Sequence, residues 1–203
     1  MIESLTLFFN TFKHHSEDQD EPLIGRFELL GISWALHLLY AFYSVFAIYL
    51  GVKSYEYFSQ STDFSHLIFD SFHFEFQKIG LVSTLFSAAF YPLVFQFSYK
   101  FWKGCFRFYA NIFDYDCDDE SLFNEKGDEV LSSAYTANFL LILPVVGSVL
   151  SQIAFAYFLF RGLKRKYDFS LLQASLVLIT PLFILFLFAV FTASYFVFLL
   201  SLL

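Results

Sequence analysis

The sequence predicts an all-α, polytopic integral membrane protein: a bundle of about five transmembrane helices with a short helical hairpin at 130–160. Composition is the first indication, because 58% of the residues are hydrophobic and only 15% are charged, whereas soluble domains carry about 25% charged residues. Segregation is the second, because apolar blocks of about 20 residues, enough to span a hydrocarbon core, alternate with short polar segments. These blocks lack the short alternating pattern of a β-barrel, so helices are expected.

The N-terminal segment, residues 1–28, is predicted to be cytoplasmic and to contain an interfacial helix. Apolar residues recur at helical spacing over 2–12, and polar residues fall largely elsewhere. This is the pattern of an amphipathic helix on a membrane surface; a frayed tail is the alternative. The segment has no basic region followed by a small-residue cleavage site, so a cleaved signal peptide is not expected.

The transmembrane domain is predicted over 29–203, and its first two spans cover about 29–52 and 79–99. Between them, segment 66–76 is expected to form a second interfacial helix, with a strand as the alternative because its phenylalanines also alternate. Pro92 is expected to kink the second span near its cytoplasmic end, since proline cannot donate the helical hydrogen bond.

The connection at 100–129 begins with basic and aromatic residues, a composition typical of the headgroup level, and ends in an acidic stretch. Asp114, Asp116, Asp118 and Glu125 match positions 1, 3, 5 and 12 of a calcium-binding loop, but the glycine at position 6 is absent. These four residues are the candidate metal ligands, and a solvated acidic loop is the favoured interpretation. No cofactor is predicted.

Segment 130–160 carries no charged residue and has Pro144 and Gly147 near its middle. A single helix of that length would extend roughly 45 Å, longer than a hydrocarbon core of roughly 30 Å. Proline removes a backbone donor and glycine adopts turn dihedrals. Pro144 and Gly147 are therefore predicted to form the turn of a hairpin with arms at 130–143 and 149–160. A kink in one long helix is the alternative.

The last span is predicted over 171–203, a segment without charged residues. Asp168 or Ser170 is expected to cap its start. Pro181 is expected to kink this span, which is predicted to be one long helix; a second re-entrant pass is the alternative.

Basic residues indicate the orientation in the membrane. With five spans, every lysine and arginine except Lys53 and Lys78 falls in segments 1–28, 100–129 or 161–170, which share one side. Cytoplasmic loops carry such an excess. The N-terminus is therefore predicted in the cytoplasm and the C-terminus outside, in a multi-pass protein of the cell's inner (plasma) membrane. One crossing in place of the hairpin would separate 161–170 from the other basic segments, so the distribution also favours the hairpin.

Two groups of residues are predicted to make contacts. One is a stripe of small residues in the second span, which lets another helix approach closely. It consists of Gly80, Thr84 and Ala88. The other is a basic group at the end of the hairpin, placed to bind anionic lipid headgroups. It consists of Arg161, Lys164, Arg165 and Lys166.

Few polar side chains lie within the predicted spans. His37, Asn138, Gln152 and Gln173 are interpreted as packing residues that form hydrogen bonds between helices, with a functional role of His37 as the alternative. The motifs G-x-S-x-G and H-E-x-x-H and the P-loop are absent. No catalytic residue is therefore predicted.

One stretch resembles the Yip (Ypt-interacting protein) family of membrane proteins, in particular its bacterial members: LPVVGSVLSQIAFAYFLFRGLKRKYDFSLLQA. It combines a Leu-Pro-x-x-Gly turn, an aromatic-rich helix and Gly-Leu-Lys. The resemblance implies about five spans, a cytoplasmic N-terminus and no enzymatic activity. Eukaryotic members act in vesicle traffic and contact small GTPases, but their Asp-Leu-Tyr-Gly-Pro-like motif before the first span is missing here.

Together these features predict a non-enzymatic scaffold or accessory factor that acts through helix packing and contacts with lipid and partners. A small membrane transporter or channel is the alternative. The expected partners are the lipid bilayer and either other membrane proteins or a second copy of the chain; no nucleic acid is expected.

Overall fold

A computed structural model describes residues 2–14, 24–59, 70–115 and 120–201. These residues are mostly helical and form no strand, which confirms the all-α prediction. In chain order the elements are α1 (Ile2–His14), α2 (Arg26–Ser59), α3 (Asp70–Ile112), α4 (Glu120–Tyr135), the 3₁₀-helix η1 (Thr136–Ile142), α5 (Gly147–Lys166) and α6 (Leu171–Ser201).

Three helices in the described part of the chain are long and apolar enough to cross a membrane. These stretches are Arg26–Gly51 in α2, Ile79–Ile112 in α3 and Leu171–Thr192 in α6. The predicted arms 130–143 and 149–160 are not among them. The membrane character of the chain is therefore supported, whereas crossing of the bilayer by the two arms stays a prediction.

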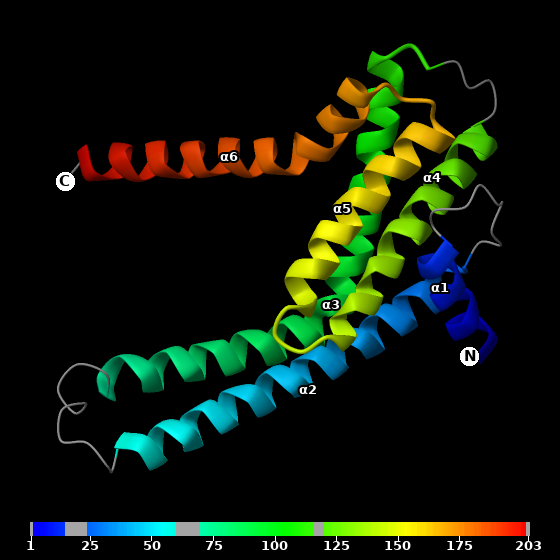
Figure 1. The fold of residues 1–203 in the computed structure, drawn as a ribbon. Helices are drawn as coiled ribbons and strands as arrows, with labels where there is room; N and C mark the ends of the chain where they lie inside the picture. Colours follow the sequence, from blue (N-terminus) through cyan, green and yellow to red (C-terminus); the bar gives the residue numbers. More distant parts are fainter. Residues whose placement is uncertain (1, 15–23, 60–69, 116–119, 202–203) are drawn as a thin grey trace.

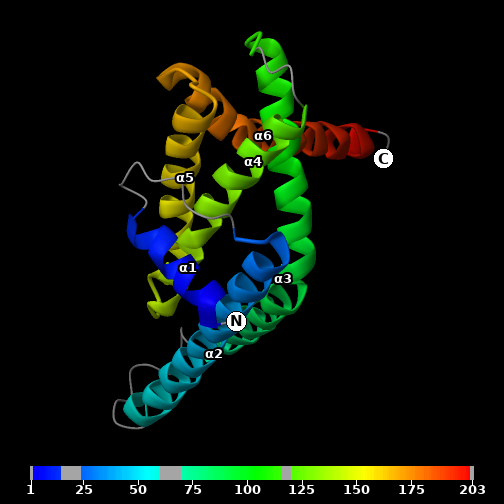
Figure 2. The ribbon, with the colours of Figure 1, turned by 90° about the vertical axis from the view of Figure 1, so that its right-hand side faces the viewer.

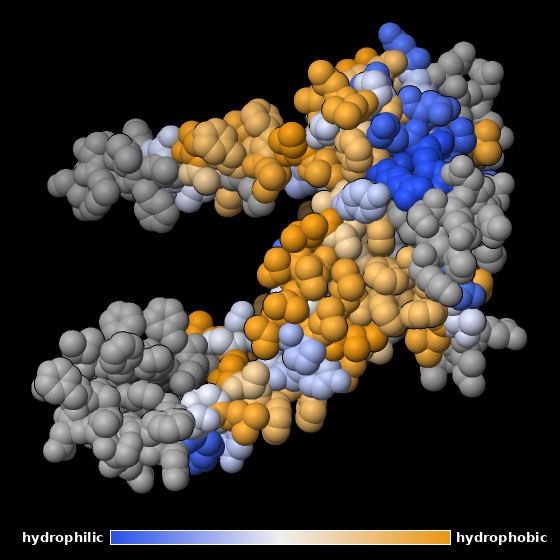
Figure 3. Space-filling view, in the orientation of Figure 1, coloured by the Kyte–Doolittle hydropathy of each residue, from blue (hydrophilic) through white to orange (hydrophobic). Residues whose placement is uncertain are grey.

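The helices form a packed centre with two projecting arms (Figure 1). One arm consists of α2 and the first half of α3, and the other is α6. In the centre, α4, η1 and α5 pack beside the second half of α3, and the view from the side shows α1 lying across them (Figure 2). In this view the surface is mostly apolar over α5 and over the coloured parts of the arms, and strongly hydrophilic near the start of α4 and the end of α5 (Figure 3).

The helix bounds correct two expected boundaries. α3 is one helix with Pro92 inside it, so the connection predicted at 100–129 begins as a continuation of the span. It stays helical because Trp102, Phe106 and Ala110 recur every fourth residue and are buried in the core. α2 likewise begins before and ends after the predicted span 29–52.

The helix expected near the N-terminus is present as α1, and part of its apolar side packs on protein. Phe8 is buried in the core. The rings of Phe9 and Phe12 both lie 5.3 Å from the ring of Phe139 in η1. α1 therefore packs on the helical core while Leu5 and Phe9 stay 46% and 44% exposed, and its expected position on the membrane surface stays a prediction. The other expected interfacial helix, at 66–76, begins among residues outside the described part; α3 itself starts at Asp70.

The hairpin of α4 and α5 is held by a close approach at Gly162. A β-carbon added there would lie 2.9 Å from Cγ1 of Val130, which is buried. Gly162→Ala is expected to destabilise the protein by about 1–2 kcal/mol, because an extra methyl group overpacks this contact. Adding Val130→Ala should recover most of the loss in SDS-induced unfolding followed by circular dichroism. Gly31→Ala, whose β-carbon meets nothing within 4 Å, is the control; a loss in that control as well would contradict the packing explanation.

The start of α6 has a reciprocal cap. The Ser170 hydroxyl accepts from the backbone N–H of Gln173 at 3.3 Å, and the Gln173 side-chain oxygen accepts from the backbone N–H of Ser170 at 2.8 Å. This capping box satisfies two backbone N–H groups at the start of the helix. Of the two expected capping residues, Ser170 is therefore the one that caps α6. Further along, α6 contains Pro181 within a single helix, as expected. The hydroxyl of Thr180 lies 2.8 Å from that of Tyr109, which ties α6 to α3 beside this proline.

Candidate functional site

A polar cluster lies where α3, η1 and α5 meet. Asn138 Nδ2 donates to the hydroxyl of Tyr91 at 3.0 Å, and the Ser151 hydroxyl donates to Asn138 Oδ1 at 3.2 Å. All three residues are buried. Each of them comes from a different element, so the cluster couples the hairpin to the kinked helix α3.

α2 adds two residues to this cluster. The imidazole ring of His37 stacks on the Tyr91 ring, with the ring centres 3.7 Å apart. His37 Nδ1 lies 2.9 Å from the carbonyl oxygen of Ser33, which can only accept a hydrogen bond. In the neutral form the proton therefore sits on Nδ1, and Nε2 is left as the acceptor. The Ser33 side chain is completely buried beside Tyr91 and makes no well-aligned hydrogen bond.

Pro92 shapes the α3 side of the site. In a regular helix the carbonyl of Ala88 would accept from the backbone N–H four residues later, but that residue is Pro92, which has none. The indole N–H of Trp34 in α2 donates to this carbonyl instead, at 2.9 Å. The freed carbonyl is thus satisfied by a neighbouring helix, as a membrane interior requires.

The turn of the hairpin is docked on α2. The Tyr40 hydroxyl lies 3.3 Å from the carbonyl oxygen of Val145 and 3.1 Å from the Ser148 hydroxyl. Tyr40 lies about 21 Å along the helix from Arg26, close to the middle of the candidate span of α2. The tip of the hairpin therefore lies level with the middle of that span.

The expected turn residues lie at this tip, but their roles differ from the prediction. The left-handed backbone conformation belongs to Val145, with φ of 66°, and not to Gly147, where φ is negative. Gly147 is required because the backbone approaches closely here, and an added β-carbon would lie 2.6 Å from the carbonyl oxygen of Leu140. Pro144 is exposed at the turn that precedes α5, where its missing N–H leaves no hydrogen bond unmade.

A second polar group lies closer to the charged ends of the helices. Asp128 Oδ1 accepts from the Tyr99 hydroxyl and from Lys103 Nζ, both at 2.8 Å. The guanidinium of Arg26 lies 4.7 Å from the centre of the Tyr99 ring and is hydrogen-bonded to the side chain of Gln96. The contacts of Asp128 join α4 to α3. The contacts of Arg26 join the start of α2 to the same part of α3.

The predicted stripe of small residues lies against α2. A β-carbon added at Gly80 would lie 3.8 Å from Cδ1 of Ile48. Ala88 is buried. Thr84 is half-buried and its hydroxyl donates to the carbonyl of Gly80 at 2.8 Å. The structure thus supplies a helix within the chain that can occupy this seam.

The candidate metal ligands are only partly described. Asp114 is exposed just after α3, and Glu125 is exposed on α4. Asp116 and Asp118 lie outside the described residues. Among those that are described, no group of three or more His, Cys, Asp or Glu side chains is arranged to hold a metal ion.

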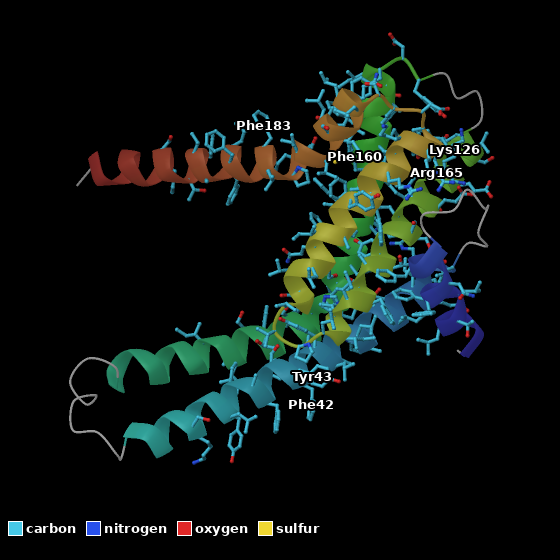
Figure 4. The ribbon with its side chains drawn as sticks, in the orientation of Figure 1. Phe42, Tyr43, Lys126, Phe160, Arg165 and Phe183 are labelled. Atoms are coloured by element: carbon cyan, nitrogen blue, oxygen red, sulfur yellow. The ribbon has the colours of Figure 1, made fainter. Side chains whose placement is uncertain are left out.

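The basic group lies at the end of α5 away from its turn. Lys166 Nζ pairs with a carboxylate oxygen of Glu129 at 2.5 Å, which closes the hairpin at its open end. Lys164 is exposed, and its ammonium lies 5.9 Å from the Phe160 ring. Arg165 is exposed at this end of α5 (Figure 4), and together with Arg161 it completes the predicted group.

Of the polar residues noted in the spans, the structure brings His37 and Asn138 together but not Gln152 and Gln173. Tyr91 and Tyr40, which organise the site, were missed. Tyrosine is common in this aromatic-rich sequence, so its presence carries little information. The pair Tyr91–Pro92 was the available signal, because a proline within a span frees a carbonyl and invites polar contacts nearby.

No protein-family model, curated protein or solved structure matches this chain.

Replacing Asn138 with leucine is expected to destabilise the protein by about 1–2 kcal/mol, because the buried hydroxyls of Tyr91 and Ser151 lose their shared partner. SDS-induced unfolding followed by circular dichroism measures the effect. Combining Asn138→Leu with Tyr91→Phe should cost less than the sum of the two single changes, since the double variant leaves fewer unpaired groups. Additive losses would show that the hydrogen bond is not formed.

Proposed function

We propose that this chain is a non-enzymatic membrane scaffold or accessory factor that works through contacts made within the bilayer. The observation that carries the proposal is the pairing of polar groups at membrane depth. The side-chain amide of Asn138 is hydrogen-bonded to the hydroxyls of Tyr91 and Ser151. Because these three side chains bind one another, they are not free to bind a solute. In contrast, the described apolar side chains of α6 beyond Pro181 include many that are widely exposed, such as Phe183 on the projecting arm (Figure 4).

We further propose that the hairpin is re-entrant. Its tip docks on Tyr40, midway along the candidate span of α2, so the hairpin would enter from the cytoplasmic side and turn back near the middle of the bilayer. Irregular backbone at that depth is tolerated when protein covers it; α2 contacts one side of the tip through Tyr40, and Val145 on the tip stays 74% exposed. The chain would then cross the membrane three times, with its N-terminus inside and its C-terminus outside.

The five-span arrangement expected from the sequence has the same sidedness. Both arrangements keep the segments 1–28, 100–129 and 161–170 on the cytoplasmic side, so both satisfy the excess of basic residues there. They differ in where the tip lies. Docking on Tyr40 supports the re-entrant arrangement.

Cross-linking in native membranes tests the scaffold proposal. A photo-reactive amino acid in place of Leu187, which is 50% exposed on α6, is expected to form adducts with another membrane protein. A matched probe at Val177, which is completely buried, should form none. Adducts with lipid alone at the Leu187 position would contradict the proposal.

A transporter is the second candidate, and one observation favours it. η1 is a 3₁₀-helix of seven residues, longer than the usual three or four, and such runs often mark hinges. It carries Asn138 into a cluster of polar groups at membrane depth, where broken helices line substrate sites in transporters. Ion flux into liposomes that contain the purified chain, abolished by Asn138→Leu, would favour this function over a scaffold.

The resemblance to the Yip family agrees with a membrane protein without enzymatic activity, and membership in that family is part of the proposal. The exposed ammonium of Lys164 and the neighbouring basic side chains are proposed to contact anionic headgroups on the cytoplasmic side. Each basic residue near such a surface contributes about 1 kcal/mol to binding.

A further inference from the structure

Gln152 is an unpaired polar residue on the outer face of α5. It is exposed, and the structure shows no hydrogen bond from its amide to any described residue. The side-chain amides of Gln96, Asn138 and Gln173, in contrast, all have partners within the chain. The residues around Gln152 on the same face are apolar and exposed: Val149 by 58%, Ile153 by 61% and Tyr157 by 55%.

The position of Gln152 along α5 places its amide within the apolar part of the hairpin. It lies about 8 Å along the helix from Gly147 at the tip and about 14 Å from Arg161, the first charged residue. An amide that faces hydrocarbon without a partner is costly, and interhelical hydrogen bonds remove that cost. This face therefore fits a partner that offers both a donor and an acceptor at the same depth.

We propose that the face of α5 formed by Val149, Gln152, Ile153 and Tyr157 binds a second copy of the chain, with the two Gln152 amides paired across a two-fold axis normal to the membrane. An amide carries both donors and an acceptor, so it is complementary to itself. Two copies inserted with the same orientation place the same residue at the same depth, and such an axis brings equivalent residues face to face. This inference rests on the proposed function, since it names one contact through which the chain would act in the bilayer.

Disulfide cross-linking of the purified full-length chain in phosphatidylcholine liposomes tests this contact. The reporter is Ile153→Cys in a background that carries Cys105→Ala and Cys117→Ala. Oxidation is expected to give a covalent dimer. Gln152→Leu should lower the dimer yield about fivefold at low protein density, the change that one lost interhelical hydrogen-bonded pair produces. Gln152→Asn keeps a donor and an acceptor and should retain most of the dimer.

Gln173→Leu is the matched control, because that amide already has a partner within the chain and its loss should leave the dimer yield unchanged. Circular dichroism checks that each variant stays folded. The Gln152 variants are expected to fold, because that side chain is exposed. Absence of a dimer at Ile153→Cys, or a yield that Gln152→Leu does not lower, would overturn the inference. These liposomes hold one protein only, so that outcome is distinct from failure of the scaffold proposal, which is tested on cross-links to other proteins.

Discussion

Gly147→Ala is expected to destabilise the protein by about 3 kcal/mol, the largest effect expected among the glycine-to-alanine changes in this chain. The added β-carbon would lie 2.6 Å from the carbonyl oxygen of Leu140 and 3.1 Å from the Cα of Leu141. Both atoms belong to the backbone, so no side-chain rotation relieves the clash. SDS-induced unfolding in detergent micelles, followed by far-ultraviolet circular dichroism, measures the loss.

Gly104→Ala is the control for this change. Gly104 is exposed on α3, and an added β-carbon meets nothing within 4 Å. Because alanine favours a helix over glycine, this control is expected to stabilise the protein by about 0.5–1 kcal/mol. The two alanine substitutions should therefore have opposite signs, and a neutral Gly147→Ala would show that the turn is not packed as described.

Trp34→Phe is expected to cost about 1–3 kcal/mol, because it removes the hydrogen bond to the carbonyl of Ala88 and leaves that oxygen buried and unpaired. The prediction depends on Pro92, which deprives Ala88 of its helical donor. Pro92→Ala restores that donor. Trp34→Phe made on top of Pro92→Ala should therefore cost much less than the same change in the natural chain.

A double-mutant cycle on unfolding free energies measures this coupling. Trp102→Phe is the control, since Trp102 makes no hydrogen bond through its indole in the described structure, although it is buried whereas Trp34 is 39% exposed. Its cost should be the same with and without Pro92. Equal costs of Trp34→Phe in both backgrounds would contradict the role assigned to the indole.

The position of the hairpin was predictable from the sequence because helix length and charge agree on it. An uncharged segment too long for one crossing, with Pro144 near its middle, left a turn as the simplest arrangement. The detailed role of Gly147 was not predictable. A glycine in a turn can be needed for a positive φ or for a close approach of the backbone. At Gly147 the close approach to Leu140 decides, and only the folded turn defines that distance.

The sequence predicts a sidedness but does not decide the number of crossings. Basic residues distinguish the two sides of the membrane but not a hairpin that crosses from one that returns at mid-depth. The length of α3 was also underestimated, because Lys100, Lys103 and Arg107 suggested a headgroup segment. The fold accommodates two of these charges, since Lys103 pairs with Asp128 and Arg107 pairs with Glu120.

The polar cluster could not be predicted, because its members are far apart in the chain. His37 and Asn138 each looked isolated within an apolar span. The kink at Pro92 and the docked hairpin bring both side chains to Tyr91. Sequence periodicity reports which residues share a face of one helix, and it carries no information on contacts between helices in a fold of this kind.

Thiol accessibility at the hairpin tip tests the re-entrant arrangement most directly. Val145→Cys, in a background with Cys105→Ala and Cys117→Ala, places one thiol at a position that is 74% exposed in the structure. A chain that keeps only Cys117 as its thiol is the cytoplasmic control and should react with an impermeant maleimide in inside-out vesicles but not in intact cells. We expect the tip thiol to react in neither preparation and only after solubilisation in denaturing detergent. Labelling of the tip in intact cells would place it outside and contradict the re-entrant hairpin in favour of five spans.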